Sequence, residues 1–279
     1  MRTQIIAEIA SSHNGDMELA AALIKSAAEA GVDYVKFQSW QAKNVSDNDP
    51  DKQRYEQLEL SDEAHFILMK ECQRNNVRFM TTVFDLNRID FLQKLGLDII
   101  KVASVDLKHT KLLKALKGKF EHIILSTGMS TPDEVKNAVE TLKGQKITLF
   151  HCVSLYPTPA DKINLDRMLW LKSFCHSVGY SDHALGSEAS KLAIAMGAEY
   201  IEKHFTLSRY LPQPVHKTSV KEGVKAITTH EIADEPLVFK EICEYAKFVK
   251  QARGQGRIDM WDEEMPVRLK YTGRLGNNT

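Results

Sequence analysis

Eight short apolar segments alternate with segments of helical spacing along this chain, and this alternation limits the possible folds more than any other feature. The predicted strands cover residues 4–10, 34–38, 77–84, 97–104, 122–128, 146–154, 177–182 and 198–205. The predicted helices cover residues 17–30, 61–74, 87–95, 110–117, 131–144, 165–174, 187–197 and 236–252. Eight strands that are each followed by a helix favour an α/β fold of the (β/α)8 TIM-barrel type over an open sheet.

Two segments do not follow this alternation of strands and helices. About twenty mostly polar residues follow the second strand, with Asn44, Asp47 and Asp49 among them, and they are either a long active-site loop or a partly disordered one. The tail, residues 253–279, is rich in Gly, Arg and Asn and only weakly periodic. We therefore expect one barrel domain, residues 1–252, and a C-terminal extension without a core of its own.

Composition excludes several classes of partner. The 37 Lys and Arg residues balance the 37 Asp and Glu residues, so no net charge attracts nucleic acid or an anionic membrane. The four cysteines form no CxxC pair, which fits a reducing cytoplasm better than a disulfide framework or a zinc knuckle. No run reaches the ~18 apolar residues of a membrane span, and Glu8 interrupts the first apolar stretch too early for a signal peptide. We expect a cytoplasmic protein that binds small molecules.

Polar side chains stand near the C-terminal end of every predicted strand, although barrel strands are otherwise mostly Val, Ile and Leu. In chain order they are Glu8, Lys36, Gln38, Thr81, Thr82, Lys101, Ser104, Ser126, Thr127, His151, Ser154, Ser181, Asp182, His183, Glu202 and His204. The C-terminal ends of barrel strands converge on one rim, where barrel enzymes place their chemistry. We therefore expect these side chains to surround a common site.

Each of these residues, taken alone, has a simpler structural explanation. A strand-end Ser or Thr, such as Ser126 or Thr82, often caps the following helix, and a lone His is often a hydrogen-bonded structural residue. Lys36 and Lys101 are harder to explain in this way, because an unpaired ammonium group is costly to bury. The alternative for each lysine is an ion pair with a nearby Asp or Glu. Polar groups at the ends of all eight strands favour a shared site over separate explanations.

The residue types indicate the chemistry of that site. Two lysines and several hydroxyl groups suit a small, highly charged anion. No Walker-type loop and no GxGxxG motif precedes a helix, so a nucleotide is not indicated. His183 and His204, on the last two strands, suggest a divalent ion such as Mn²⁺ with positions left open for water or substrate, rather than a closed zinc site. A small phosphorylated carboxylate fits this combination best.

The sequence also contains four long motifs: "AEIASSHNGDMELAAALIKSAAEAGVDYVKFQ", "ILSTGMSTPDEV", "HCVSLYPTP" and "GYSDHALGSEASKLAIAMGAEYIEKHFTL". They resemble the N-acetylneuraminate (sialic acid) synthase family, and the resemblance extends from about residue 5 to residue 220. It implies a (β/α)8 barrel and a transferase that condenses phosphoenolpyruvate with an N-acylated hexosamine aldehyde. The implied cofactor is Mn²⁺, with Mg²⁺ as the alternative, and the product is a nine-carbon 2-keto acid. A homodimer is expected on the same basis.

The resemblance assigns roles to individual residues. The residues that would hold phosphoenolpyruvate are Lys36, Thr82, Lys101, Ser104, Ser126, Ser154 and Ser181. Gln38 and Tyr156 match positions near the acceptor sugar. The metal ligands would be His183 and His204. Glu8 matches an acid that handles the proton or water at the reacting carbon, with Asp106 as a second catalytic candidate.

The match is weaker at a few positions. Ser154 stands where many members have Asn, and Asp106 stands where some carry Glu. On the acceptor side Gln213 replaces a glycine, and Val215 replaces an acid that contacts the acceptor. The resemblance covers the barrel only, because this sequence ends before the antifreeze-like domain that usually follows it.

Two alternatives stay open at this point. The chain could be a related synthase with a different acceptor, either a diamino sugar of the legionaminate or pseudaminate type or a sugar without an N-acyl group. The changed acceptor side motivates this alternative. It could instead be a barrel that binds phosphoenolpyruvate without catalysis, but retention of Glu8, both lysines and both histidines argues against that reading.

Overall fold

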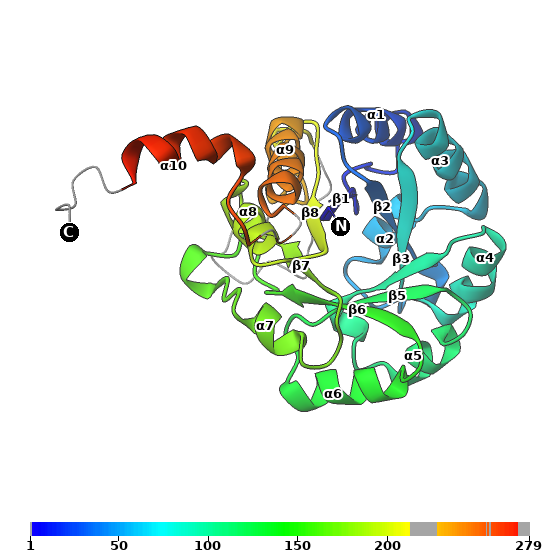
Figure 1. The fold of residues 1–279 in the computed structure, drawn as a ribbon. Coiled ribbons are helices and arrows are strands. Elements are labelled where there is room, and N and C mark those ends of the chain that lie inside the picture. Colours follow the sequence, from blue (N-terminus) through cyan, green and yellow to red (C-terminus); the bar gives the residue numbers. More distant parts are fainter. Residues whose placement is uncertain (1, 213–227, 255, 257, 273–279) are drawn as a thin grey trace.

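The structure is a computed structural model that describes residues 2–212, 228–254, 256 and 258–272. Eight parallel strands pair in chain order, and β8 also pairs with β1, so the sheet closes into a barrel. The strands are β1 (Gln4–Glu8), β2 (Tyr34–Ser39), β3 (Arg78–Val83), β4 (Ile99–Val102), β5 (His122–Ser126), β6 (Lys146–Cys152), β7 (Val178–Asp182) and β8 (Tyr200–His204). Figure 1 shows the strands inside an outer layer of helices. The predicted barrel is confirmed.

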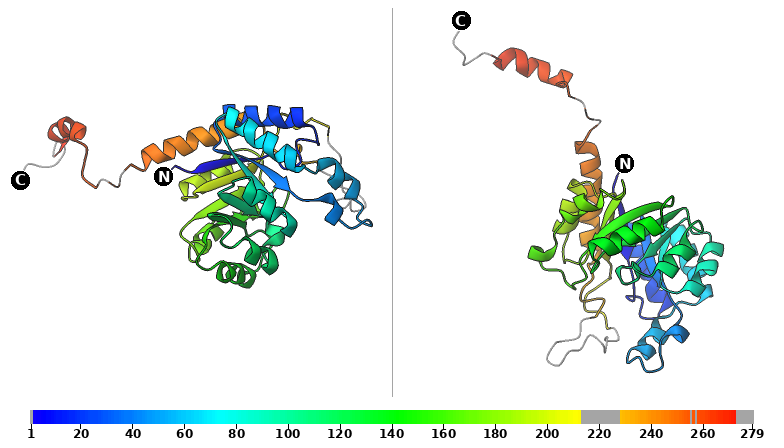
Figure 2. Two further views of the ribbon diagram at one scale, coloured as in Figure 1. Left: turned by 90° about the vertical axis from the view of Figure 1, so that its right-hand side faces the viewer. Right: turned by 90° about the horizontal axis from the view of Figure 1, so that it is seen from below.

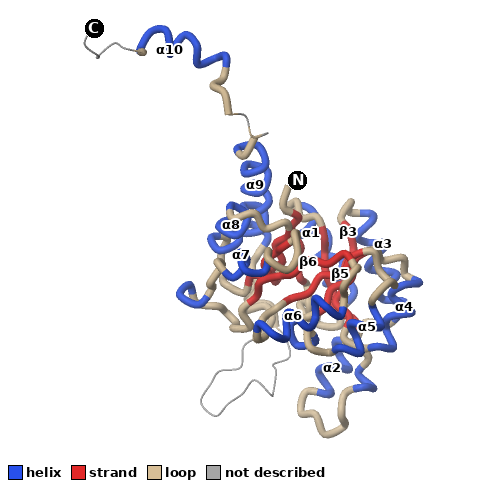
Figure 3. The backbone as a smooth tube through the Cα atoms, turned by 60° about the horizontal axis from the view of Figure 1, so that its bottom comes forward, coloured by secondary structure: helices blue, strands red, loops and turns tan. Residues whose placement is uncertain are grey.

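The helices follow the predicted order. They are α1 (Met17–Glu29), α2 (Lys52–Leu58), α3 (Asp62–Arg74), α4 (Ile89–Lys94), α5 (Thr110–Leu116), α6 (Pro132–Thr141), α7 (Arg167–Leu171), α8 (Glu188–Ala195), α9 (Pro236–Ala252) and α10 (Met265–Tyr271). Short 3-10 helices are η1 (Ala42–Asn44), η2 (Leu86–Arg88), η3 (Ser104–Asp106), η4 (Ala160–Lys162) and η5 (Asp262–Glu264). In Figure 3 the strands gather at the centre of the main body, with helices around them.

Local sequence signals fix several helix starts. The Ser61 hydroxyl accepts a hydrogen bond from the Ala64 amide at 3.1 Å and caps α3. Thr131 caps α6 and forms a reciprocal capping box with Glu134. Such caps satisfy amide groups that the first turn of a helix leaves without partners.

The barrel has two apolar regions. The larger core lies between the strands and the surrounding helices and includes Ile5, Ala7 and Ile9 of the first strand segment. A second buried cluster consists of Ile6, Tyr34, Met80, Ile124 and Phe150. Because successive side chains of a strand point to opposite faces, the second cluster occupies the barrel interior. It forms an apolar floor beneath the polar strand ends.

The segment between β2 and α3 is more ordered than predicted. It contains η1 and α2 rather than an irregular or disordered loop. Ala42 and Leu58 are buried, and the Ala42 amide donates to the Glu59 carboxylate at 2.8 Å. The Gln41 amide donates to Asp85 after β3 at 2.6 Å. Of the residues that suggested disorder, Asp47 pairs with Lys52 and Asp49 accepts a hydrogen bond from the Asp51 amide at 2.8 Å, so both help to order the segment.

The C-terminal tail contains a helix that the sequence pattern did not indicate. Figure 2 shows α10 standing away from the barrel, and none of its residues is buried. Within the described ranges, no helix combines the length and apolar character needed to cross a bilayer. The cytoplasmic location and the homodimer stay predictions.

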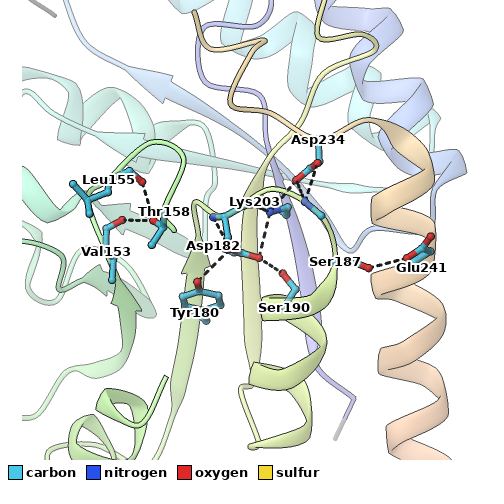
Figure 4. Close-up of polar contacts among 12 residues, drawn as sticks. Val153, Leu155, Thr158, Tyr180, Asp182, Ser187, Ser190, Lys203, Asp234 and Glu241 are labelled. Carbon is cyan, nitrogen blue, oxygen red and sulfur yellow. Dashed lines mark hydrogen bonds and ion pairs between the residues drawn. The ribbon is translucent and has the colours of Figure 1, made fainter. Parts of the chain in front are cut away.

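A buried charge cluster on the outer side of β7 and β8 ties the barrel to the segment before α9 (Figure 4). The Lys203 Nζ lies 3.3 Å from Asp182 Oδ2 and 2.9 Å from Asp234 Oδ2, and all three side chains are almost completely buried. Ser190 donates to Asp182 at 2.6 Å, and Arg209 pairs with Asp234. These contacts fix the strand ends that precede His183 and include His204.

Replacing Lys203 by Met is expected to destabilise the fold, because Asp182 then lies buried without its cation and Asp234 keeps only Arg209. Removing one partner of a buried ion pair costs about 3–5 kcal/mol. Urea unfolding followed by circular dichroism measures the loss. The matched control is Lys143→Met, since Lys143 forms an exposed pair with Glu140 at 3.1 Å, and it should change stability by less than ~0.5 kcal/mol. Equal stability of the two variants would contradict this account of the cluster.

Candidate active site

The strand register brings the polar strand ends together in one layer. Glu8 of β1 is paired in register with Lys36 on one side and His204 on the other. Further pairs around the barrel are Gln38 with Thr82, Thr82 with Lys101, Cys152 with Ser181, and Ser181 with Glu202. Neighbouring polar groups are therefore held side by side by the backbone, directly above the apolar floor.

These side chains surround a cavity of about 390 Å³. Its lining includes every residue to which the resemblance assigned a role except Asp106: Glu8, Lys36, Gln38, Thr82, Lys101, Ser104, Ser126, Ser154, Tyr156, Ser181, His183 and His204. The strand-end residues Thr81, Thr127, His151 and Asp182 do not line it, because alternation turns them to the opposite face of the sheet. The lining also includes Phe84, Ala103, Val105, Met129, Cys152 and Glu202. The structure thus places the residues assigned to donor, acceptor, metal and proton transfer around one space.

Glu202 is the centre of the charge network in this cavity. Its Oε1 lies 3.2 Å from the Lys101 Nζ, and its Oε2 lies 3.7 Å from the Lys36 Nζ. Lys36 also forms a direct ion pair with Glu8. Both lysines therefore have acidic partners, so the alternative explanation for buried lysines is confirmed. Those partners lie in the same cavity, which makes the network part of the site.

Two hydroxyl groups extend this network. The Lys36 ammonium donates to Thr82 Oγ1 at 2.7 Å. Ser181 donates to Glu202 Oε1 at 3.1 Å, and its hydroxyl lies 3.0 Å from that of Ser126. Charge and hydroxyl groups from β2, β3, β5, β7 and β8 are thus connected, and together they offer several donors to a small anion.

Gly128 makes room for the remaining serines. Its amide donates to Ser104 Oγ at 3.0 Å. A Cβ atom at this position would lie 2.6 Å from Ser154 Oγ and 2.8 Å from Ser104 Oγ. These separations are too short for any real contact, so a larger residue would displace the two hydroxyls. The glycine after β5 therefore keeps both serines at the cavity wall.

Burial changes the protonation of the charged residues. Burial lowers the pKa of Lys36 to about 7, against the attraction of Glu202. Burial acts to raise the pKa of Glu202, but the charges of Lys101 and Lys36 outweigh it and hold that pKa at about 2. Glu202 is therefore ionised at neutral pH, whereas Lys36 gains or loses its proton readily. A ligand that brings negative charge would favour the protonated lysine.

The two histidines face each other across β7 and β8, with ring centroids 5.7 Å apart. His183 Nδ1 lies 2.7 Å from the Val153 carbonyl and donates to it, so in the neutral ring Nε2 carries the free lone pair. Burial acts to lower the pKa of His183, but Cys152 and the Val153 carbonyl outweigh it and raise that pKa. Burial, with the nearby His183, lowers the pKa of His204 to about 3, so this ring is neutral. Its Nδ1 is buried and has no hydrogen-bond partner among the described residues.

This pair fits a metal site with open positions. Neutral imidazoles are the form that binds metal ions, and a second hydrogen bond orients one of them. In the part of the chain that the structure describes, no cluster of three or more His, Cys, Asp and Glu could complete a closed site. Two protein ligands leave the remaining positions for water or substrate.

Asp106 is not brought to the cavity. It ends η3, and its carboxyl group lies 3.8 Å from His109 Nδ1. Burial raises its pKa. Ser104 begins the same turn and does line the cavity, but a 3-10 turn directs a residue two positions later to a different side. The structure therefore gives no support to Asp106 as a second catalytic acid.

The sequence placed Glu202 at the rim without giving it a role, and it did not point out Cys152. Strand alternation could have identified Cys152, which stands two residues before Ser154. The Cys152 Sγ lies 3.8 Å from His183 Nδ1.

A larger cavity of about 760 Å³ adjoins the first. The two share Gln38, Phe84, Val105, Ser154, Tyr156 and His204. Gln38 and Tyr156, the predicted acceptor residues, thus lie at the junction, and Tyr156 packs on His183 with ring centroids 4.1 Å apart. Gln213 and Val215 lie outside the described residues. Thr228 and Thr229, which were not predicted, line the larger cavity.

Comparison with known proteins agrees with this arrangement. The profile of the NeuB family matches residues 23–256. N,N'-diacetyllegionaminic acid synthase of Campylobacter jejuni is 38% identical, over 91% of this chain and 78% of the relative. N-acetylneuraminate-9-phosphate synthase of Drosophila melanogaster is 31% identical, over 95% of this chain and 75% of the relative. The crystal structure of N-acetylneuraminic acid (sialic acid) synthetase from Leptospira borgpetersenii in complex with citrate has a TM-score of 0.85 at 29% identity, covering 100% of this chain and 94% of that one. The chain therefore belongs to the NeuB family of sugar-acid synthases.

Proposed function

We propose that this enzyme condenses phosphoenolpyruvate with an aldose of the N-acylated hexosamine class. The product is a 2-keto-3-deoxy sugar acid of the sialic acid (nonulosonate) type, and phosphate is released. The observation that carries the proposal is the 390 Å³ cavity, where two buried lysines, several hydroxyls and two histidines meet beside a larger cavity. The smaller space suits a three-carbon phosphate, and the larger one suits a sugar.

The lysines and hydroxyls bind the donor. Lys36 and Lys101 supply positive charge to the phosphate and carboxylate groups, and Thr82, Ser126 and Ser181 supply neutral hydrogen-bond donors. Without ligand the lysines are neutralised by Glu8 and Glu202. The donor's negative charges replace these acids as partners of the lysines. The Glu8 carboxylate is then available for acid–base chemistry.

Carbon–carbon bond formation and phosphate release then follow in two stages. The C3 carbon of phosphoenolpyruvate attacks the aldehyde carbon of the acceptor, and the aldehyde oxygen takes up a proton. Water adds at the cation-like C2, the bond between C2 and the bridging oxygen breaks, and phosphate leaves. Glu8 is the leading acid–base candidate because it borders both Lys36 and His204 in the barrel register. The lysines stabilise charge on the departing phosphate.

His183 and His204 would hold Mn²⁺, with Mg²⁺ as the alternative. When bound, the ion polarises a carbonyl group of the substrate. The support for this assignment is the neutral state of His204 and the fixed orientation of His183. His204 also lines both cavities, which supports an ion held beside the aldehyde end of an acceptor.

The acceptor has a second candidate, a diacetamido sugar of the legionaminate type. Val45, Val105, Leu155 and Ile232 give the larger cavity apolar walls that suit methyl and acetyl groups. The 38% identical relative named as a legionaminic acid synthase also favours it. N-acetylmannosamine and the diacetamido sugar therefore both belong in the acceptor panel.

Incubation with phosphoenolpyruvate, Mn²⁺ and an aldose panel should release phosphate only when an acceptor is present, with the matching 2-keto acid in the mass spectrum. Lys101→Met should lower kcat/KM by ~10²-fold or more, because a charge that stabilises the departing phosphate is lost. Lys114→Met, an exposed lysine on α5, is the matched control and should retain full activity. Donor binding without product from any aldose would instead favour a non-catalytic barrel.

Affinity for phosphoenolpyruvate should fall as the pH rises above about 7. In the empty site the pKa of Lys36 is about 7, and an anionic ligand raises it, so binding above pH 7 takes up a proton. For one titrating group the affinity should fall by at most about tenfold per pH unit. Glu8, Glu202 and Lys101 are the other charged groups that face Lys36. Calorimetry at pH 8 in two buffers of different ionisation enthalpy should show proton uptake that Lys36→Met abolishes. Equal uptake in both proteins would refute the assignment.

A further inference from the structure

Arg54 is a buried cation in the larger cavity. The residue is only 9% exposed, and its Nε atom is buried without a hydrogen-bond partner. Its Nη2 donates to Ser11 Oγ at 3.0 Å. Among the described residues no carboxylate forms an ion pair with Arg54, although Asp51 attracts it from farther away. The guanidinium group is therefore desolvated and only partly satisfied.

The other charged groups near the two cavities are better compensated. Lys36 and Lys101 each pair with an acid inside the smaller cavity. The acid that lines the larger cavity, Asp85, accepts a hydrogen bond from the Gln41 amide at 2.6 Å. A buried charge without a partner is destabilising, so a bound anion would gain more from Arg54 than from the two lysines, which are already paired. The unmatched charge lies on the acceptor side and not on the donor side.

The position of Arg54 indicates which part of an acceptor it meets. Gln38, Tyr156 and His204 line both cavities, whereas Arg54 lines only the larger one. An acceptor whose aldehyde lies beside His204 would therefore direct its far end toward Arg54. Trp40 and Tyr55 also line the larger cavity, and their rings meet edge to face with centroids 6.0 Å apart. They offer aromatic surface to a sugar ring.

We propose that the acceptor carries an anionic group, a phosphate monoester or a carboxylate, at the end remote from its aldehyde, and that Arg54 binds that group. This inference rests on the proposed synthase function and narrows its substrate class. A guanidinium fork matches two oxygens of either anion, and its free Nε supplies one donor of the pair. Arg54 thus determines acceptor specificity and takes no part in the chemistry at the aldehyde.

The test compares N-acetylmannosamine with its 6-phosphate and with the analogue that has a carboxylate at C6. In the wild type at least one anionic acceptor should exceed the neutral sugar in kcat/KM by about tenfold or more, and the better of the two identifies the anion. Arg54→Gln should lower kcat/KM for that acceptor by roughly 10- to 100-fold, the range of a charged hydrogen bond, mainly through KM. The KM for phosphoenolpyruvate should not change, and Arg54→Lys should restore part of the loss. Arg74→Gln, at an exposed pair with Glu71 on α3, is the matched control.

A wild type that uses the neutral sugar as well as both anionic ones overturns the inference, and so does an Arg54→Gln variant that keeps the preference. Preference for the neutral diacetamido sugar overturns it as well. If phosphoenolpyruvate releases no phosphate with any aldose, the synthase proposal fails. Calorimetric binding of the anionic sugars then tests the role of Arg54 by itself. Binding of the 6-phosphate or 6-carboxylate sugar that Arg54→Gln weakens at least tenfold supports the anion site, and unchanged or absent binding removes it.

Discussion

Glu202 compensates two buried ammonium groups, and the rest of the site depends on that compensation. Lys36 on β2 and Lys101 on β4 would repel each other and lose their hydration if they stood alone in this cavity. Glu202 lies within ion-pair distance of both, and Glu8 adds a second carboxylate beside Lys36. The four groups sum to no net charge above a floor of apolar side chains. The barrel can therefore fold with the lysines in place before any substrate binds.

The same network prepares the site for an anion. In the proposed reaction a phosphorylated carboxylate would bring the negative charge that the two glutamates otherwise provide, so binding would exchange one set of partners for another. Because burial holds the pKa of Lys36 at about 7, the exchange would favour a fully protonated lysine. The carboxylate that it would release, Glu8, stands next to His204 in register. The proposal thus connects binding and proton transfer through the ion pair of Lys36 with Glu8.

Alternate residues of β8 serve two different purposes. Glu202 and His204 face the cavity, whereas Lys203 between them points outward into the cluster with Asp182 and Asp234. The outer cluster also reaches the turn after β7 through Ala184. Stability of the strand ends and orientation of the two histidines thus come from one short stretch of sequence, "IEKHF".

The sequence predicted the barrel and most of the rim because both follow from regular periods. Alternation along each strand and the convergence of parallel strand ends are enough to gather Lys36, Lys101, His183 and His204. Asp106, which the resemblance offered as a second catalytic candidate, lies in a 3-10 turn and lines neither cavity. Alternation placed Glu202 at the rim, but its ion pairs with Lys36 and Lys101 join distant segments, as does the contact of Arg54 with Ser11, and no local pattern reports such contacts. The order of the segment between β2 and α3 was missed because one of its tethers, the bond from the Gln41 amide to Asp85, reaches another loop.

A crystal structure of the protein with phosphoenolpyruvate and Mn²⁺ tests the central claim most directly. The account predicts the phosphate and carboxylate groups within hydrogen-bond distance of Lys36 and Lys101, with Glu8 separated from Lys36 and the metal ion on His183 and His204. Ligand bound elsewhere, or bound while both lysines keep their carboxylate partners, would contradict it.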